Sequence, residues 1–161
     1  MTVLQDELSI TLERTQGAQH DAARIWARAT AVRDGRPDRL DAIGPALDGI
    51  RSRLALPDAS LHLARRAGVA VGFALLVPRG GTLEITYLAV DPSHWGEDVA
   101  THLLDNVEEH ARLLRFGTID LWVIADNTRA IARYERAGFG LTTDVQDAAG
   151  RLERRMEYTL Y

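Results

Sequence analysis

The sequence predicts an α/β fold, a mixed seven-stranded sheet with helices on both faces. Three observations support this prediction. Segments with strand-like patterning alternate with segments of helical periodicity, in the order β-α-α-β-β-β-α-β-α-β-β. Glycine- or proline-containing turns separate most of them. The length of 161 residues suits one domain with a single core, over residues 1–161.

The first half of the chain supplies three strands and two helices. Gly44 and Pro45 fall within the second helix and should kink or restart it. Ala67 and Gly68 separate two apolar strands and predict a hairpin. The expected elements are a strand at 9–14, helices at 20–32 and 40–54, and strands at 60–65 and 69–77.

The second half is expected to form the remaining four strands and two helices. Gly117 should end the first of these helices in the left-handed conformation. Asn127 or Thr128 can cap the start of the second. The strand between the helices is almost continuously apolar, which predicts a central, buried position. The expected elements are a strand at 83–90, a helix at 99–114, a strand at 118–125, a helix at 129–137, and strands at 141–146 and 152–160.

Composition excludes several classes of function. The net charge of −4 argues against a nucleic-acid partner, which usually needs a basic field. The chain has no cysteine and five histidines without ligand spacing, so no metal is expected. No apolar run reaches membrane-spanning length and the N-terminus has no signal-like segment, which predicts a cytoplasmic protein without membrane contact.

The stretch from Thr82 to Ala111 predicts an anion site. A strand is followed by a turn that contains Pro92 and Gly96, and then by a helix with one apolar face. The unpaired N–H groups and positive dipole at such a helix start can bind phosphate.

Two motifs in this sequence resemble the GNAT superfamily of N-acetyltransferases. Residues 90–100, VDPSHWGEDVA, resemble the family's V-x-P and the pyrophosphate loop after it. Asn127, Ala130, Tyr134 and Gly138-Phe139 follow the spacing of its second motif. The resemblance implies the GNAT (acyl-CoA N-acyltransferase) fold and transfer of an acetyl group from acetyl-CoA to a primary amine. Direct attack is expected, because the chain has neither cysteine nor a recognisable serine-based triad.

The resemblance also implies a set of cofactor-binding residues. The pantetheine arm would pair with backbone at the end of the strand at 83–90, although these could be ordinary ladder residues. The loop and helix start would hold the pyrophosphate. Asn127 would add a cofactor contact compatible with capping its helix. The expected cofactor-binding residues are Leu88, Ala89, Val90, Trp95, Gly96, Glu97, Asp98, Val99, Ala100, Thr101 and Asn127.

Two residues are expected to carry the chemistry. In the family, the tyrosine matching Tyr134 protonates or orients the thiolate sulfur; the alternative is a core tyrosine. The resemblance also implies a base at Glu84, the only charge in its strand, which is expected on the face of Thr86, Leu88 and Val90; the alternative is a sheet-end carboxylate paired with an Arg or left in solvent. His94 and His102 are expected to be surface residues.

The loop departs from the family pattern at two positions. Trp95 stands in the Arg/Gln place and Asp98 in that of the first glycine. Asp98 could repel phosphate together with Glu97, or cap the helix with its carboxylate and fill the anion site. We therefore expect weakened or lost acetyl-CoA binding. The alternative function is a non-catalytic GNAT-fold binding module with a degenerate pyrophosphate loop; a third possibility is a longer acyl-CoA.

The acceptor is not predicted beyond its class. In this fold the acceptor side is formed by the first two helices and the last hairpin, here about 25–54 and 141–152. Both segments mix Arg with Asp, so a small-molecule or peptide amine acceptor is expected without further choice. A homodimer is also open, since dimers are common in the superfamily.

Overall fold

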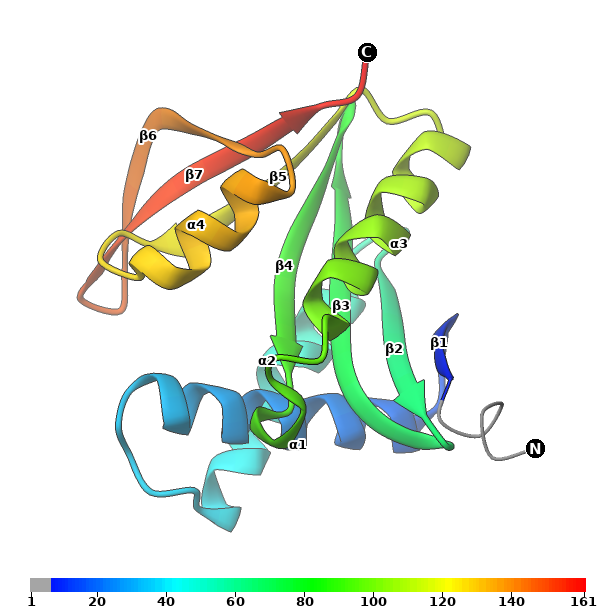
Figure 1. The fold of residues 1–161 in the computed structure, drawn as a ribbon, viewed down its shortest axis with the longest axis vertical. Coiled ribbons are helices and arrows are strands. Elements are labelled where there is room, and N and C mark those ends of the chain that lie inside the picture. Colours follow the sequence, from blue (N-terminus) through cyan, green and yellow to red (C-terminus); the bar gives the residue numbers. More distant parts are fainter. Residues whose placement is uncertain (1–6) are drawn as a thin grey trace.

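The computed structural model describes residues 7–161, and Figure 1 shows its elements. The helices are α1 (Gln16–Arg33), α2 (Ile43–Leu54), α3 (Val99–Leu113) and α4 (Thr128–Arg136), with short 3-10 turns η2 (Leu40–Ala42) and η3 (Pro92–His94). The strands are β1 (Leu8–Leu12), β2 (Ser60–Arg66), β3 (Val69–Arg79), β4 (Thr82–Val90), β5 (Thr118–Ile124), β6 (Gly140–Ala148) and β7 (Arg151–Thr159).

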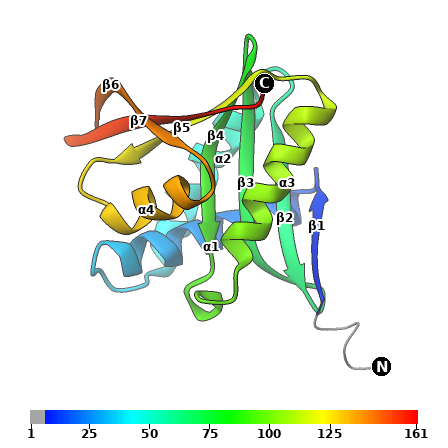
Figure 2. The same ribbon diagram turned by 45° about the horizontal axis from the view of Figure 1, so that its top comes forward.

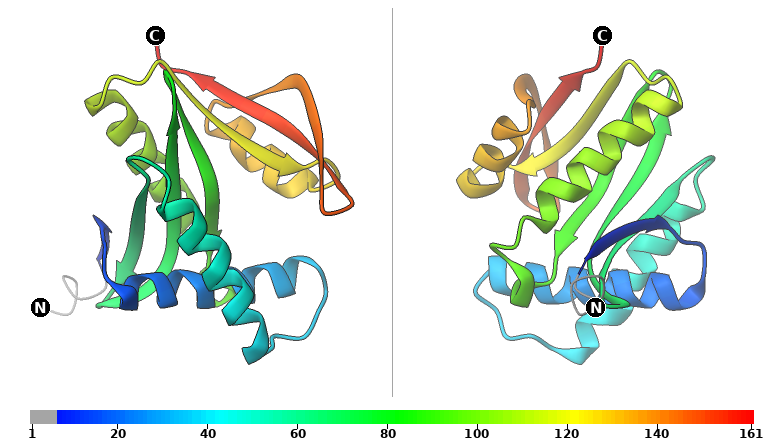
Figure 3. Two further views of the ribbon diagram at one scale, coloured as in Figure 1. Left: turned by 180° about the vertical axis from the view of Figure 1, so that it is seen from behind. Right: turned by 45° about the vertical axis from the view of Figure 1, so that its right-hand side comes forward.

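The expected architecture is confirmed. The seven strands form one sheet in the order β1-β2-β3-β4-β5-β7-β6. The β4–β5 pair is parallel and the other pairs are antiparallel, so the sheet is mixed. Helices α1 and α2 pack on one face, around Ile25, Ile50 and Phe73. Helices α3 and α4 cover the other face, around Leu103 and Met156. Figures 2 and 3 show the two layers of helices from different sides.

Most boundaries follow local sequence signals. The helix expected at 20–32 begins earlier, at Gln16, because the Thr15 side chain caps it by accepting from the Ala18 N–H at 3.1 Å. The second helix restarts as expected: η2 gives way to α2, and Pro45 lies in the first turn of α2, where a missing N–H costs no helical hydrogen bond. Ala67 and Gly68 both have positive φ, as a tight hairpin requires.

The end of α3 differs from expectation. The left-handed residue there is Arg115 at φ 64°, and not Gly117. The Phe116 N–H reaches back to the Ala111 carbonyl at 2.9 Å, which closes the helix one turn before the glycine. Gly117 instead links strands: its N–H donates to the Gly81 carbonyl and its own carbonyl accepts from Leu160.

Strands β4 and β5 separate about halfway along β4. Their pairing runs from Thr82↔Thr118 to Ile85↔Leu121 and ends there, although β4 continues to Val90. Beyond that point β5 follows β7 and diverges from β4, which Figure 1 shows as a V between β4 and the β5–β7 pair. The inner edge of the second half of β4 therefore faces a gap instead of a neighbouring strand.

A β-bulge changes which face the residues of β4 occupy. The register with β3 passes from Leu76↔Ile85 to Leu75↔Tyr87, so Thr86 is an extra residue in β4. Because of this extra residue, Glu84 does not share a face with Leu88 and Val90, and that expectation was wrong. Leu88 and Val90 join the core beneath α3, whereas Glu84 lies on the side of α1 and α2, beside Val77.

Within residues 7–161, no helix has the length and hydropathy needed to cross a membrane.

Candidate functional site

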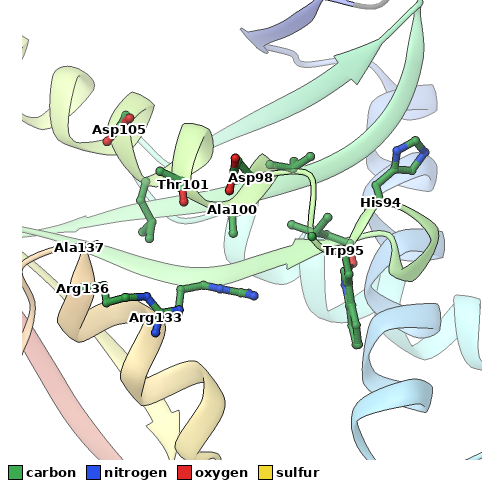
Figure 4. Close-up of a pocket in the computed structure, with 13 residues that line it drawn as sticks. His94, Trp95, Asp98, Ala100, Thr101, Asp105, Arg133, Arg136 and Ala137 are labelled. Carbon is green, nitrogen blue, oxygen red and sulfur yellow. Dashed lines mark hydrogen bonds between the residues drawn. The ribbon is translucent and has the colours of Figure 1, made fainter.

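A pocket lies where the loop after β4 meets the start of α3 and the side of α4. Its volume is about 520 Å³. The β4–α3 loop and the first turns of α3 form one wall, and α4 forms the opposite wall (Figure 4). The lining residues are Val90, His94, Trp95, Gly96, Asp98, Val99, Ala100, Thr101, Leu104, Asp105, Arg133, Arg136 and Ala137. Seven of the eleven residues expected to bind cofactor are thus brought together in one pocket.

The loop backbone presents donors to this pocket. Gly96 has φ 86° and Asp98, at the N-cap of α3, has φ 62°. Aspartate tolerates this left-handed conformation better than most residues, so Asp98 replaces a glycine without breaking the turn. Among the described residues its carboxylate makes no capping hydrogen bond, so of the two possibilities for Asp98, filling the helix start is not what the structure has. The first N–H groups of α3 stay available to a ligand.

Glu97 is turned away from the pocket. Its carboxylate lies 3.0 Å from His94 Nδ1 and 3.6 Å from Arg66 Nε. Both neighbours are potential cations, so the charge of Glu97 is partly balanced locally. Asp98 is therefore the acidic loop residue that lines the pocket, with Asp105 further along α3.

Trp95 joins the two walls. Its indole N–H donates to the Val90 carbonyl at 2.8 Å, at the end of β4. The guanidinium carbon of Arg129, on α4, lies 5.2 Å from the centre of the indole ring, a cation–π distance. Trp95 thus fixes the loop to β4 and connects it to α4, across the gap between the two halves of the sheet.

Besides Glu97, three other expected cofactor contacts lie outside the lining. Leu88 and Ala89 pair with Ala74 and Phe73 of β3, and their opposite edge faces the gap. Asn127 caps α4, as expected: its Oδ1 accepts from the Ala130 N–H at 3.2 Å.

Tyr134 lies on α4 and packs into the core beneath α3 and α4. Its ring meets Phe139 edge to face with centres 5.9 Å apart. Burial raises the pKa of Tyr134 to about 12, although the Arg133 charge opposes this shift. The phenol therefore keeps its proton at neutral pH and can only donate it to a stronger base. The geometry agrees with both readings of this residue, a core tyrosine and an acid.

Glu84 lies on the other face of the sheet, at the last residue pairs before β4 and β5 separate. It forms an ion pair with Arg79 at 2.8 Å and neighbours Asp120 of β5 in register. Burial, assisted by the negative charge of Asp120, raises the pKa of Glu84 above its ordinary value, against the opposing charges of Arg79 and Arg53. Asp120 is itself buried and bound to Arg155 at 2.8 Å. A carboxylate with a raised pKa beside a gap suits proton transfer.

Sequence reasoning missed Arg133 and Arg136. Both extend from α4 toward the start of α3, opposite Asp98 and Thr101 (Figure 4). Their signal was present in the sequence: Arg129, Arg133 and Arg136 are spaced by four and three, which places them on one helix face.

The pocket fits a phosphorylated ligand. Helical N–H groups on one wall and two arginines on the other can bind phosphate oxygens. Among residues 7–161, no three His, Cys, Asp or Glu side chains cluster closely enough to hold a metal ion.

Known proteins with similar sequences belong to one family of acetyltransferases. The Acetyltransferase (GNAT) family matches residues 20–139. Mycothiol acetyltransferase of Propionibacterium freudenreichii subsp. shermanii is 38% identical over 109 residues, 62% of this chain and 34% of that protein. Mycothiol acetyltransferase of Clavibacter sepedonicus is 40% identical over 90 residues, 55% of this chain and 30% of that protein. The chain therefore spans about a third of the length of these curated relatives.

Solved structures show the same fold at low identity. The ribosomal-protein-S18-alanine N-acetyltransferase of Escherichia coli superposes with a TM-score of 0.76 at 19% identity, covering 96% of this chain and 94% of that chain. A GNAT family acetyltransferase of Elizabethkingia anophelis with acetyl-CoA bound gives 0.69 at 17% identity, covering 96% and 99%. The family match spans α3, β5 and α4, the elements that enclose the gap and the pocket. The chain belongs to the GNAT family of acetyltransferases.

Proposed function

We propose that this chain is an N-acetyltransferase that moves an acetyl group from acetyl-CoA to a primary amine. The observation that carries the proposal is the early end of β4–β5 pairing at Ile85↔Leu121, because the unpaired half of β4 beyond it runs to Val90, which lines a pocket with helical N–H donors. The gap leaves the edge of β4 at Leu88, Ala89 and Val90 without a neighbouring strand, so the pantetheine arm can pair there, although the Val90 carbonyl already accepts from the Trp95 indole. The loop and the first turn of α3 then hold the pyrophosphate. All 161 residues are taken as one domain.

The positions of Glu84 and Tyr134 support direct attack. Glu84 lies on the face of α1 and α2, and Tyr134 lies on the face of α3 and α4. The gap between the strands therefore separates a candidate base on one face from a candidate acid on the other. An amine that arrives from the side of α1 and α2 would meet the thioester with the leaving sulfur on the opposite side.

Bound acetyl-CoA supplies a thioester carbonyl that a neutral amine can attack. Glu84 accepts the proton that the nitrogen loses as the carbon–nitrogen bond forms, directly or through water. Backbone N–H groups at the end of β4 stabilise the developing oxyanion. Tyr134 donates a hydrogen bond to the sulfur as the carbon–sulfur bond breaks, and the thiolate then takes up a proton from solvent. The products are an amide and the free thiol.

The environment of Glu84 favours a cationic acceptor. Asp120 neighbours it on β5, and Arg155 links Asp120 to Asp144 and Glu157 of the last two strands. Carboxylates outnumber arginines in this group, and an ammonium group is attracted to such a surface. The names of the curated relatives make mycothiol chemistry one case to include, beside peptide N-termini, polyamines and aminoglycoside antibiotics.

The test is thiol release from acetyl-CoA in the presence of an amine panel, with CoA binding measured by calorimetry. The proposal predicts amine-dependent thiol release by the wild type. It also predicts that Glu84→Gln binds CoA normally while turnover falls. CoA binding without turnover on any amine would favour the second candidate, a non-catalytic binding module. Asp98 in the pocket wall is the observation on which that candidate rests.

A further inference from the structure

We propose that Asp120 of β5 is a positioning residue for the candidate base: its Oδ1 accepts a hydrogen bond from Glu84 once Glu84 has taken the proton of the attacking amine. The two carboxyl groups then hold one proton between them. This inference rests on the proposed function, since it concerns the proton that the amine loses. It gives a role to a residue that belongs to neither of the two sequence motifs.

Glu84 and Asp120 are neighbours across the seam of the sheet. They are partners in the parallel pairing of β4 and β5, one residue before this pairing ends at Ile85↔Leu121. Partners on adjacent strands lie about 5 Å apart and direct their side chains to the same face. Ile119 and Leu121 join the core beneath α3, so Asp120 between them lies on the opposite face, with Glu84. The two carboxyl groups therefore lie next to each other where the gap begins.

One oxygen of Asp120 is buried without a partner. Only 7% of the residue is exposed. Its Oδ2 accepts from Arg155 Nε at 2.8 Å, whereas its Oδ1 has no hydrogen bond with any residue in the range 7–161. A buried carboxylate oxygen in this state lowers stability until a donor reaches it. Glu84 becomes such a donor when it is protonated, because a carboxylic acid carries an O–H group.

The surrounding arginines leave this hydrogen bond possible. Arg79 Nε donates to Glu84 Oε2 at 2.8 Å, just as Arg155 holds Asp120 Oδ2, so each arginine binds one oxygen of its carboxylate. Burial raises the pKa of Glu84, and the charge of Asp120 raises it further, against the charge of Arg79. The charged side chains around the pair are Arg53 (α2), Arg79 (β3), Asp144 (β6), Arg155 and Glu157 (β7).

The proton transfer can be followed atom by atom. The amine nitrogen forms its bond to the thioester carbon and loses a proton to Glu84 Oε1, directly or through water. The new O–H of Glu84 then donates to Asp120 Oδ1. A hydrogen bond to an ionised oxygen is stronger than one between neutral groups, so Asp120 makes Glu84 a better proton acceptor than an isolated carboxylate. After the products leave, the proton passes to solvent and both groups are ionised again.

The direct test is a pH titration of the ligand-free wild type, followed by the NMR signals of its side-chain carboxyl carbons. Glu84→Gln and Asp120→Asn identify the two signals. The Asp120 signal should shift at the titration midpoint of Glu84, because the pair titrates as one unit. In Asp120→Asn the midpoint of Glu84 should fall. If Asp120→Asn does not fold, the wild-type titration alone still decides the question.

The matched control in the titration is Glu157→Gln. Glu157 of β7 is the partner of Asp120 on its other side and also pairs with Arg155, so this change removes one carboxylate from the same row. Two strand spacings, about 10 Å, separate it from Glu84. The midpoint of Glu84 should therefore stay almost unchanged. An equal fall of this midpoint in Glu157→Gln and Asp120→Asn would mean that only general charge matters, and would refute the role of Asp120.

Kinetics supply a second measurement. With an amine that the wild type acetylates, Asp120→Asn should lower kcat about tenfold, the usual loss for one hydrogen bond to a charged group, with little change in the KM for acetyl-CoA. A purely structural role would lower the melting temperature without this split between kcat and KM.

The titration needs no acetyl transfer, so the two proposals can fail separately. If the Asp120 signal does not respond at the midpoint of Glu84, the shared proton is refuted and the proposed function stands. If the signals are coupled but the wild type acetylates no amine of the panel, the proposed function fails and the catalytic role of Asp120 falls with it.

Discussion

His62 makes the stability of this protein depend on pH in a way that can be calculated. It lies on β2 with 3% of its surface exposed, and its Nε2 is 2.8 Å from the Ser60 hydroxyl. His110 of α3 meets it edge to face, with ring centres 4.8 Å apart. Burial, with a smaller contribution from the charge of His110, lowers the pKa of His62 from 6.5 to about 4, against an opposing hydrogen bond to Asn106.

The direction of the pH effect follows from the difference between the pKa of His62 in the folded chain and in the unfolded chain. The unfolded chain binds a proton at His62 near pH 6.5, whereas the folded chain resists it down to about pH 4. Above pH 6.5, where His62 is neutral in both states, it therefore costs the folded state no stability. As the pH falls from 6.5 toward 4, protonation of the unfolded chain progressively lowers the free energy of unfolding. The full loss is about 3 kcal/mol, and the part between pH 7 and pH 5 is about 2 kcal/mol.

The test compares wild type with His62→Gln by urea unfolding at several pH values between 7 and 5. Glutamine keeps a polar group for Ser60 but does not titrate, so its packing defect is constant with pH. The stability advantage of the wild type over the variant should shrink by about 2 kcal/mol across this range. His102→Gln, at an exposed position on α3, should leave the pH profile unchanged. A difference between wild type and His62→Gln that stays constant to within about 0.5 kcal/mol would refute the reasoning.

Four further substitutions test the end of α4, the loop, the candidate base and the carboxylate beside that base. Gly138→Ala should destabilise the fold by about 2 kcal/mol or more in urea unfolding, because φ is 104° and the new methyl would overlap the Tyr158 ring; an unchanged midpoint would contradict this. Asp98→Asn should tighten CoA binding several-fold in calorimetry, since it removes a charge but tolerates the same backbone; weaker binding would show that the carboxylate helps. Glu84→Gln should lower kcat by about 10²-fold or more with little change in the KM for acetyl-CoA. In the wild type kcat should rise with pH through the raised pKa of Glu84, and Asp120→Asn should move that rise to lower pH.

The sequence predicted the architecture well because its signals were local. Asn127 caps α4 and Ala67-Gly68 forms the hairpin, as their residue types require. The pocket was also predicted in outline, since a strand, a glycine turn and a helix start are contiguous in the chain. Contiguity is why Gly96, Val99 and Ala100 could be assigned to one wall.

The predictions that were wrong or missing concern features that no local sequence pattern encodes. The face of Glu84 depends on a single extra residue at Thr86, and the bulge is set by pairing with β3. The left-handed residue after α3 is Arg115, because the chain must turn before Gly117 can link to Gly81. Arg136 was visible as a helical arginine, but its place in the pocket depends on how α4 packs beside α3.

The short β4–β5 seam also affects how this molecule should unfold and respond to ligand. Four residue pairs join the β1–β4 half of the sheet to the β5–β7–β6 half. Sub-global opening at such a seam exposes backbone amides to exchange at lower cost than global unfolding. A ligand that spans the gap contacts both halves at once and binds only when they are assembled. Occupancy should then slow amide exchange on both sides of the seam together and raise the melting temperature with ligand concentration.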